Sequence, residues 1–450
     1  MNALASQVAA WTGGRLIGAD VLLGAVGQDS RTLQHGGLFV ALRGERGDGH
    51  DHVAAVVGRA AAVLVERELP LAIAQIVVPD ALAALQKLAR AWLDAQDVRR
   101  LALTGSNGKT STKALIAAIL AQVGPTWATP GNYNNEIGVP LTLLGLRPEH
   151  RFAVIEMGCG KPGDIDELAA IAPPHAAVVT NVAAAHLERL HSEEGVAQAK
   201  AGIYRGLLDG GVAVINADDA FAHFFRAQAG AHPIIDFAID GPAAVRAEHL
   251  DIGLRSRFRL ATPAGSVPID LPLPGRHNVM NALAATSLAL AVGAPLEAIA
   301  CGLAQAAAVG GRQRRLEARG GVIYDDSYNA NPGSLTAAIE TLALERSPRW
   351  LVLGDMAELG PQAGMLHALC GALARARGIE RLYAVGPLSL AAADAFGDGA
   401  QHYARVETLI DELLTQWQPG TIALVKGSRS ARMERVVAAL AGNATVGGAH

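Results

Sequence analysis

The segment TGSNGKTSTK, from Thr104 to Lys113, is the feature that most constrains the fold. The apolar run RRLALTG leads into it, and KTSTKALIAAILAQV continues from it with the apolar spacing of a helix. A strand, a glycine-containing loop and a helix in this order form a phosphate-binding unit, because the loop N–H groups and the helix N-terminus face an anion. The segment therefore predicts an α/β domain that binds a nucleotide.

This loop differs at one position from the usual pattern G-x-x-x-x-G-K-[ST], which would have a glycine where this chain has Leu103. A glycine turn that merely joins strand to helix is the plainer interpretation, but it gives no packing reason for a Lys-Thr pair at the helix mouth. Lys109 is predicted to neutralise β- and γ-phosphate oxygens, and Thr110 to offer its hydroxyl to magnesium. The loop residues expected to bind nucleotide are Gly105, Ser106, Asn107, Gly108, Lys109, Thr110 and Ser111.

The length of 450 residues and the pattern of apolar runs predict three α/β domains. Residues 1–80 read as a small α/β domain. Residues 81–311 read as a central domain built around the phosphate loop, with a mostly parallel sheet of short apolar strands and an antiparallel addition near residues 246–274. Residues 312–450 return to alternating strands and helices and read as a C-terminal Rossmann-like domain.

Composition excludes several other classes of protein. The formal net charge is −4 and no basic stripe is present, which argues against nucleic-acid binding. The alanine-rich stretch 281–310 is divided by Gly293 and Pro295, so it predicts two packed helices rather than a membrane span. The N-terminus has no secretion signal, and we expect a monomer in a reducing cytoplasm. The three cysteines are scattered, without metal or redox spacing: Cys159, Cys301 and Cys370.

Several longer segments together resemble the Mur ligase family. They are TPGNYNNEIGVPLTLL (129–144), EMGCGKPGDI (156–165), GRHNVMNALAA (275–285), DDSYNANPGS (325–334) and GDMAELG (354–360). The similarity runs from DSRTLQHGGLFVALRGERGDGHD (29–51) to KGSRSARME (426–434), and DDSYNANP is its most discriminating part. The resemblance implies three domains and an ATP-dependent amide ligation through an acyl phosphate.

Within the family, these segments most resemble the enzymes that join D-alanyl-D-alanine to UDP-N-acetylmuramoyl-tripeptide. Another Mur-type ligase or a folylpolyglutamate-type ligase would share the phosphate loop but use a different acceptor. A P-loop kinase or a nucleotide switch is the alternative from another class, and it would not need a second metal site.

The resemblance also implies roles for residues outside the phosphate loop. Two magnesium ions would be held by Thr110, Glu156, His186 and Lys200, with Lys200 carbamylated by carbon dioxide. Asn278 would contact adenine, Arg312 would reach the γ-phosphate on domain closure, and Asp326 would meet the ribose or the hinge, with Tyr328 and Asn331 beside it. The acyl substrate would be bound by Ser30, Arg31 and Thr32 of the first domain and by Asn132, Asn134, Asn135 and Glu136.

Some of these residues also have ordinary structural interpretations. Lys200 could be a solvated helix lysine that pairs with Glu193 or Glu194, and Asn278 could belong to a capped helix start. The segment AKAGIY carries Gly202 where the family commonly has an acid, and HLERLHS lacks a glycine that relatives often carry. Neither departure removes a proposed metal ligand.

Overall fold

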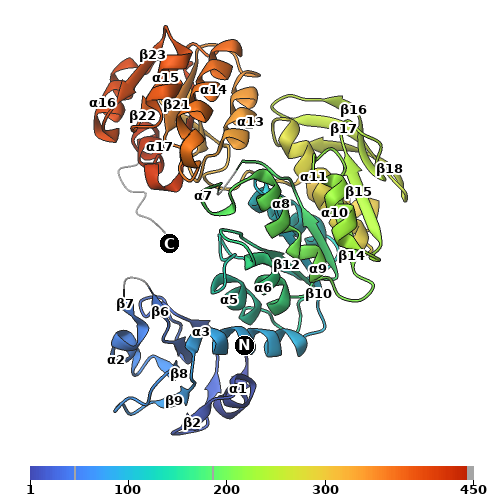
Figure 1. The fold of residues 1–450 in the computed structure, drawn as a ribbon, viewed down its shortest axis with the longest axis vertical. Helices are drawn as coiled ribbons and strands as arrows, with labels where there is room; N and C mark the ends of the chain where they lie inside the picture. The colour runs from blue at the N-terminus through green and yellow to red at the C-terminus, as the bar shows by residue number, and fades with distance from the viewer. Residues whose placement is uncertain (45–46, 185–186, 443–450) are drawn as a thin grey trace.

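The structure is a computed structural model that describes residues 1–44, 47–184 and 187–442. Figure 1 shows three α/β bodies that follow one another along the long axis, with the N-terminal body at one end and the C-terminal body at the other. Each is built on its own sheet, of five, nine and six strands in chain order. The predicted α/β class and the multidomain architecture are confirmed.

The N-terminal sheet has the strand order β2-β9-β8-β5-β4. Strands β4, β5, β8 and β9 pair in parallel and β2 is antiparallel at the edge. The glycine-rich segment between β5 and β8 contains a short hairpin and a short helix. The bounds are α1 (Ala5–Thr12), β2 (Arg15–Ile17), β4 (Val26–Gly27), β5 (Gly37–Val40), β6 (Arg43–Gly44), β7 (Gly47–Asp48), α2 (Val53–Val56), β8 (Ala60–Val65) and β9 (Ala74–Val77).

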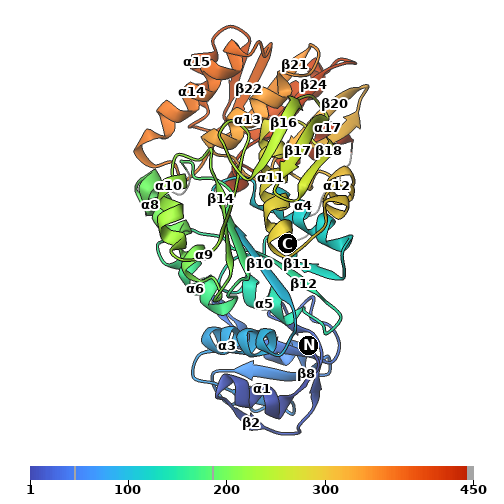
Figure 2. The same cartoon turned by 90° about the vertical axis from the view of Figure 1, so that its right-hand side faces the viewer.

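Helix α3 (Ala81–Asp94) leads from the first domain to the second, as its position in Figures 1 and 2 shows. Asp80 caps its N-terminus by accepting from the backbone N–H of Ala83 at 2.9 Å. Leu85, Leu88 and Trp92 lie on its buried face, and Trp92 Nε1 donates to the carbonyl of Leu146 at 3.1 Å. This helix therefore packs on both neighbours rather than acting as a loose linker.

The central sheet has the strand order β11-β12-β10-β13-β14-β15-β16-β17-β18. The strands from β11 to β16 pair in parallel, and β16, β17 and β18 form the antiparallel addition that the alternating pattern predicts. The bounds are β10 (Arg99–Thr104), β11 (Thr126–Ala128), β12 (Phe152–Glu156), β13 (Ala176–Val179), β14 (Val212–Asn216), β15 (Ile234–Ala238), β16 (Val245–Asp251), β17 (Ser256–Thr262) and β18 (Gly265–Leu271).

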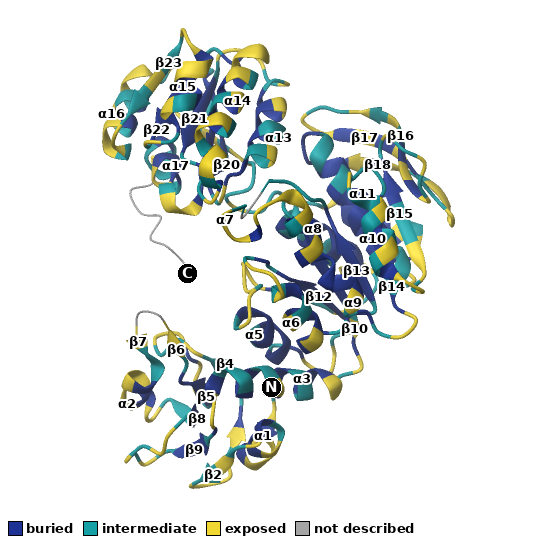
Figure 3. Ribbon diagram, viewed as in Figure 1, coloured by how far each residue is buried: buried dark blue, intermediate teal, exposed yellow. Residues whose placement is uncertain are grey.

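Helices cover both faces of the parallel part of the central sheet, where β12 and β13 are dark in Figure 3, whereas β16, β17 and β18 mix buried and exposed residues. One core contains side chains of α4, α11 and α12, and the other contains side chains of α3, α5, α6, α8 and α9. The bounds are α4 (Lys109–Ala121), α5 (Gly138–Leu144), α6 (Asp164–Ile171), α8 (Glu193–Lys200), α9 (Gly202–Arg205), α11 (Arg276–Ala291) and α12 (Leu296–Ala304).

The alanine-rich stretch forms the two packed helices α11 and α12. No helix in the described parts of the chain has the length and apolar character needed to cross a membrane.

The C-terminal sheet has the order β19-β20-β24-β21-β22-β23, and β19 is its antiparallel edge strand. The neighbours β20, β24 and β21 run in parallel at its centre, so their carboxyl ends meet at one edge. The bounds are β19 (Arg314–Ala318), β20 (Gly321–Asp326), α13 (Pro332–Leu342), β21 (Arg349–Gly354), α14 (Ala363–Ala376), β22 (Arg381–Val385), α15 (Leu390–Phe396), β23 (Ala400–Tyr403), α16 (Val406–Gln416), β24 (Ile422–Lys426) and α17 (Glu434–Ala441).

A substitution at Gly302 on α12 tests the close packing of this helix on α4, the helix that follows the phosphate loop. A Cβ at this position would clash with the backbone of Ile119 on α4. Gly302→Leu is expected to destabilise the protein by about 2–3 kcal/mol, because the backbone of α4 cannot move aside as a side chain would. Gly310→Leu is the matched control, since a Cβ there meets nothing within 4 Å. Scanning calorimetry should show a lower transition midpoint for Gly302→Leu alone, and equal midpoints would contradict this account of the packing.

Candidate active site

A cleft of about 1230 Å³ is lined by residues of the central and C-terminal domains. Both domains direct the carboxyl ends of parallel strands toward it, which is where α/β sheets bind ligands. Of the residues predicted from the sequence, the structure brings the following together in this cleft: Ser106, Asn107, Gly108, Lys109, Ser111, Asn134, Asn135, Glu136, Glu156, Asn278, Arg312, Asp326, Tyr328 and Asn331.

The phosphate loop takes its shape from two glycines. Gly105 has φ 154° and Gly108 has φ 81°, conformations that favour glycine, and a Cβ at either would clash with a neighbouring side chain. Lys109 begins α4, and its Nζ donates to the carbonyl of Gly105 at 2.6 Å. Burial lowers the pKa of Lys109. The lysine is thus folded over its own loop, within reach of the position where a phosphate would sit.

Glu156 ends β12 next to the first turn of α4. Its carboxylate accepts from Thr110 Oγ1 at 3.1 Å, from Asn134 Nδ2 at 2.8 Å and from Lys113 Nζ at 3.0 Å. Burial by itself raises the pKa of Glu156, but the charges of Lys113 and Lys109 and the hydrogen bonds outweigh it and leave the pKa lowered. An ionised carboxylate is therefore held against a threonine hydroxyl.

The Thr110 hydroxyl and the Glu156 carboxylate are hard oxygen ligands of the kind that Mg²⁺ prefers. Within residues 1–44, 47–184 and 187–442, no group of three or more His, Cys, Asp or Glu side chains gathers to hold a metal ion. The residues therefore fit a magnesium ion that completes its coordination with nucleotide oxygens and water, which is the usual arrangement for this ion.

Lys200 lies at the end of α8 and is 1% exposed. The interpretation of Lys200 as a solvated lysine is therefore wrong. Burial, together with the charge of Lys109, lowers the pKa of Lys200 to about 7, against a smaller opposing effect of Cys159. The other residue predicted for this second metal position, His186, lies outside the described residues.

Gly202 has a clear structural reason to be a glycine. A Cβ at this position would lie 2.8 Å from the carboxylate of Asp166, which projects from α6. That carboxylate accepts from Arg205 Nε at 2.9 Å and from Arg205 Nη2 at 3.0 Å. The acid that the family commonly carries at position 202 is absent, and an acid from a neighbouring helix occupies the adjoining space.

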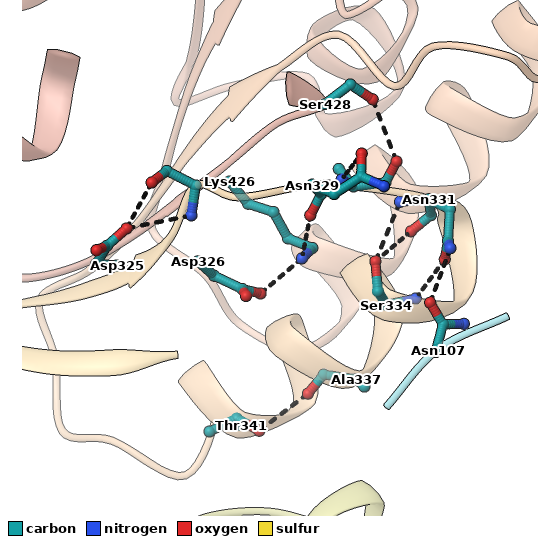
Figure 4. Close-up of polar contacts among 12 residues, drawn as sticks. Asn107, Asp325, Asp326, Asn329, Asn331, Ser334, Ala337, Thr341, Lys426 and Ser428 are labelled. Carbon is teal, nitrogen blue, oxygen red and sulfur yellow. Dashed lines mark hydrogen bonds and ion pairs between the residues drawn. The ribbon is translucent and has the colours of Figure 1, made fainter. Parts of the chain in front are cut away.

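On the opposite side of the cleft, Asp326 ends β20 and Lys426 ends β24. The two residues are paired in the parallel register. Lys426 Nζ donates to Asp326 Oδ2 at 2.6 Å and to the carbonyl of Asn329 at 3.0 Å, as Figure 4 shows. Burial is the largest influence on Asp326 and raises its pKa in spite of the lysine. The predicted nucleotide contact of Asp326 would therefore have to share its carboxylate with Lys426.

Asn331 joins the two domains across the cleft. Its Nδ2 donates to Asn107 Oδ1 of the phosphate loop at 2.8 Å, and its Oδ1 caps α13 by accepting from the backbone N–H of Ser334 at 2.9 Å (Figure 4). Nearby, the guanidinium of Arg312 stacks over the ring of Tyr328 at 4.4 Å from its centroid. The start of the C-terminal domain is thus in direct contact with the predicted phosphate site.

Asn278 caps no backbone N–H of α11, although it stands at the start of this helix. It lies in the first turn of α11, where its Nδ2 donates to the carbonyl of Pro274 at 2.8 Å, and it also lines the cleft. The bond to Pro274 holds the Asn278 side chain at the start of α11, and the start of this helix lies at the wall of the cleft.

The predicted acyl-substrate residues of the first domain do not line the cleft. Arg31 makes two side-chain hydrogen bonds to Asp29, at 2.9 and 2.7 Å, and its side chain is 84% exposed. The carbonyl of Ser30 accepts from Arg59. Asn132 is exposed outside the cleft, although Asn134, Asn135 and Glu136 of the same loop line it. Ser30, Arg31 and Thr32 thus form a separate polar loop.

Two lysines at the site were missed by the sequence analysis. Lys113 follows Lys109 by four residues, a spacing that puts both on one face of α4, and this spacing is a usable signal. Lys426 ends the apolar run TIALVK at the carboxyl edge of a predicted strand, which is the position that the other site residues share.

The sequence matches known protein families and individual relatives along most of its length. The model of the Mur ligase middle domain matches residues 103–289, and that of the Mur ligase glutamate ligase domain matches residues 311–429. The UDP-N-acetylmuramoyl-tripeptide–D-alanyl-D-alanine ligase of Escherichia coli is 46% identical, over 98% of each chain.

Solved structures give the same result. A crystal structure of MurF from Acinetobacter baumannii has a TM-score of 0.92 at 35% identity and covers 98% of this chain and 99% of its own. A MurF ligase from Thermotoga maritima, solved in complex with ADP, has a TM-score of 0.83 at 26% identity and covers 93% of this chain and 97% of its own.

The buried pair of Lys426 and Asp326 can be tested by its contribution to stability. Lys426→Met is expected to cost about 3 kcal/mol or more, because it leaves a buried carboxylate without its cation, and Lys426→Met/Asp326→Asn should recover much of that loss. The matched control is the half-exposed pair of Arg435 and Glu407, 2.7 Å apart, whose removal should change the stability much less, because solvent screens an exposed pair. Thermal unfolding measures both, and equal losses for the two pairs would contradict the role given to burial.

Proposed function

Because the chain belongs to the Mur ligase family, we propose that it joins D-alanyl-D-alanine to UDP-N-acetylmuramoyl-tripeptide at the expense of ATP. The products are the UDP-linked pentapeptide, ADP and inorganic phosphate. The observation that carries the proposal is the cleft in which the phosphate loop and the buried Glu156 of one domain face Arg312 of the next. The full-length similarity to enzymes of this name supports the choice of substrates.

Activation of the carboxyl group needs cations more than it needs a side-chain nucleophile. A carboxylate does not react with an amine at neutral pH, so its oxygen first attacks the γ-phosphorus of ATP, and ADP leaves. Negative charge accumulates on the transferred phosphoryl group, and Lys109 and Arg312 are among the cationic side chains that line the cleft. Bound Mg²⁺ would supply further neutralisation of that charge.

The second step consumes the acyl phosphate. The deprotonated amine of the dipeptide attacks the carbonyl carbon, and phosphate leaves. Water would destroy the intermediate, so the site must close first. The hydrogen bond from Asn331 to Asn107 joins the C-terminal domain to the phosphate loop. This contact would help to hold the two domains together when the site closes.

We assign the second metal position to His186 and Lys200, with two magnesium ions in all. A protonated Lys200 would repel the ion, whereas its carbamate would carry a negative charge. Carbamate formation requires the neutral amine, which adds to carbon dioxide and loses a proton. The burial of Lys200 and its pKa of about 7 support this chemistry, because a large part of the amine is neutral near pH 7.

The remaining assignments follow the arrangement of domains. Ser30, Arg31 and Thr32 bind the uridine diphosphate end of the acyl substrate. The loop with Asn132, Asn134, Asn135 and Glu136 binds the part nearer to ATP. One chain supplies both sides of the cleft, which supports a monomer as the working unit. All three cysteines are unpaired, which supports a reducing compartment such as the cytoplasm.

Phosphate release from the purified protein tests the proposal. Release from ATP should require UDP-N-acetylmuramoyl-tripeptide and D-alanyl-D-alanine together, with a pentapeptide product seen by mass spectrometry. A kinase would need one acceptor, and a nucleotide switch would need neither. Release that is equally fast without the dipeptide, or that uses a single amino acid in its place, would contradict this choice of acceptor.

Lys200→Ala tests the proposed carbamate. The variant should lose nearly all ligase activity, because the second metal position loses its negative ligand, and added formate or acetate should restore part of it by occupying the vacated space. Lys87→Ala, a change at an exposed lysine of α3, is the control and should keep wild-type activity with or without the additive. Full activity of Lys200→Ala in the absence of any additive would rule out the carbamate.

A further inference from the structure

Lys113 is a buried cation beside the carboxylate assigned to the first metal. Its side chain is 7% exposed, and that of Glu156 is 1% exposed. Its Nζ lies 3.0 Å from Glu156 Oε2 and donates to the carbonyl of Gly131 at 2.7 Å. The ammonium therefore has two acceptors, the Glu156 carboxylate and the Gly131 carbonyl, which lies in the turn that begins the loop of Asn134.

The Glu156 carboxylate has partners on both oxygens before any metal arrives. Asn134 Nδ2 donates to Oε1 at 2.8 Å, and the Thr110 hydroxyl and Lys113 share Oε2, at 3.1 Å and 3.0 Å. A buried carboxylate without these partners would carry a large desolvation cost and would attract any available divalent cation. With them, its charge is already balanced by a buried lysine that a second acceptor also holds.

We propose that Lys113 is a positioning residue that keeps the Glu156 carboxylate turned toward Thr110 and, by balancing its charge, prevents Mg²⁺ from binding until a nucleotide brings further negative charge. The inference rests on the proposed nucleotide and metal site. Its consequence is ordered loading, because Mg²⁺ binds together with ATP and not to the empty loop. Without Lys113, Mg²⁺ could bind Glu156 first, and each incoming triphosphate would then have to bind around an ion that is already in place.

The arrangement distinguishes Lys113 from Lys109. Lys109 lines the cleft and belongs to the loop that faces phosphate, whereas Lys113 does not line the cleft and is one helical turn farther along α4. Lys113 therefore acts on the carboxylate and not on the nucleotide. A change of Lys113 should alter the response to metal even when no turnover takes place.

The test is the thermal midpoint in MgCl2 without nucleotide, compared with NaCl of equal ionic strength. The wild-type midpoint should move little with MgCl2 alone and clearly with MgCl2 and ADP. Lys113→Met should be less stable in NaCl and should gain about 2 °C or more from MgCl2 alone, because the metal replaces the lost cation. Lys113→Met/Glu156→Gln should lose that gain, and Lys87→Met should behave as the wild type.

Two results would overturn the inference: a wild-type protein that MgCl2 alone stabilises as much as it stabilises Lys113→Met, or a Lys113→Met variant with no response to MgCl2. If Lys113→Met does not fold, the wild-type measurement and Lys113→Arg, which keeps the charge and should remain insensitive to MgCl2 alone, still decide the question. None of these measurements uses the acyl substrate or the dipeptide. The wrong choice of substrates would therefore appear in phosphate release and leave the metal response unchanged.

Discussion

The parallel register of β10, β12 and β13 is the constraint on which the site depends. Leu103 pairs with Glu156 and Thr104 pairs with Val179 across these strands, so the phosphate loop, the metal carboxylate and the segment after β13 all start at one edge. The loop then uses that proximity, since the backbone N–H of Asn107 donates to Asn181 Oδ1 at 3.0 Å. A shift of one residue in this register would separate Thr110 from Glu156.

Each of the two facing domains ends a parallel strand in a buried carboxylate that is paired with a lysine. In the central domain Glu156 pairs with Lys113, and in the C-terminal domain Asp326 pairs with Lys426. Such pairs contribute little net stability, because the desolvation of both ions offsets most of their attraction. Their value here is positional: each holds a carboxylate in one orientation at the wall of a cleft that must receive a highly charged ligand.

Much of the fold could be predicted because its signals are local. The apolar runs, the helix spacing of α3 and α4, and the alternation of β16 to β18 depend on neighbours a few residues away. The contacts that complete the site join residues far apart in the chain, such as Asn331 with Asn107, and no periodic pattern encodes them. Lys113 was missed because a lysine inside an amphipathic helix usually marks a solvated face.

The departures from the family pattern illustrate the same limit. In the sequence, Gly202 stands where the family commonly has an acid. In the structure, the space next to Gly202 is occupied by the carboxylate of Asp166, which lies thirty-six positions earlier in the chain. A larger residue at 202 would strike the Asp166 carboxylate, which Arg205 holds in place. The glycine at position 202 is therefore explained by the packing of α9 on α6, and Lys200, two residues earlier, stays buried beside it.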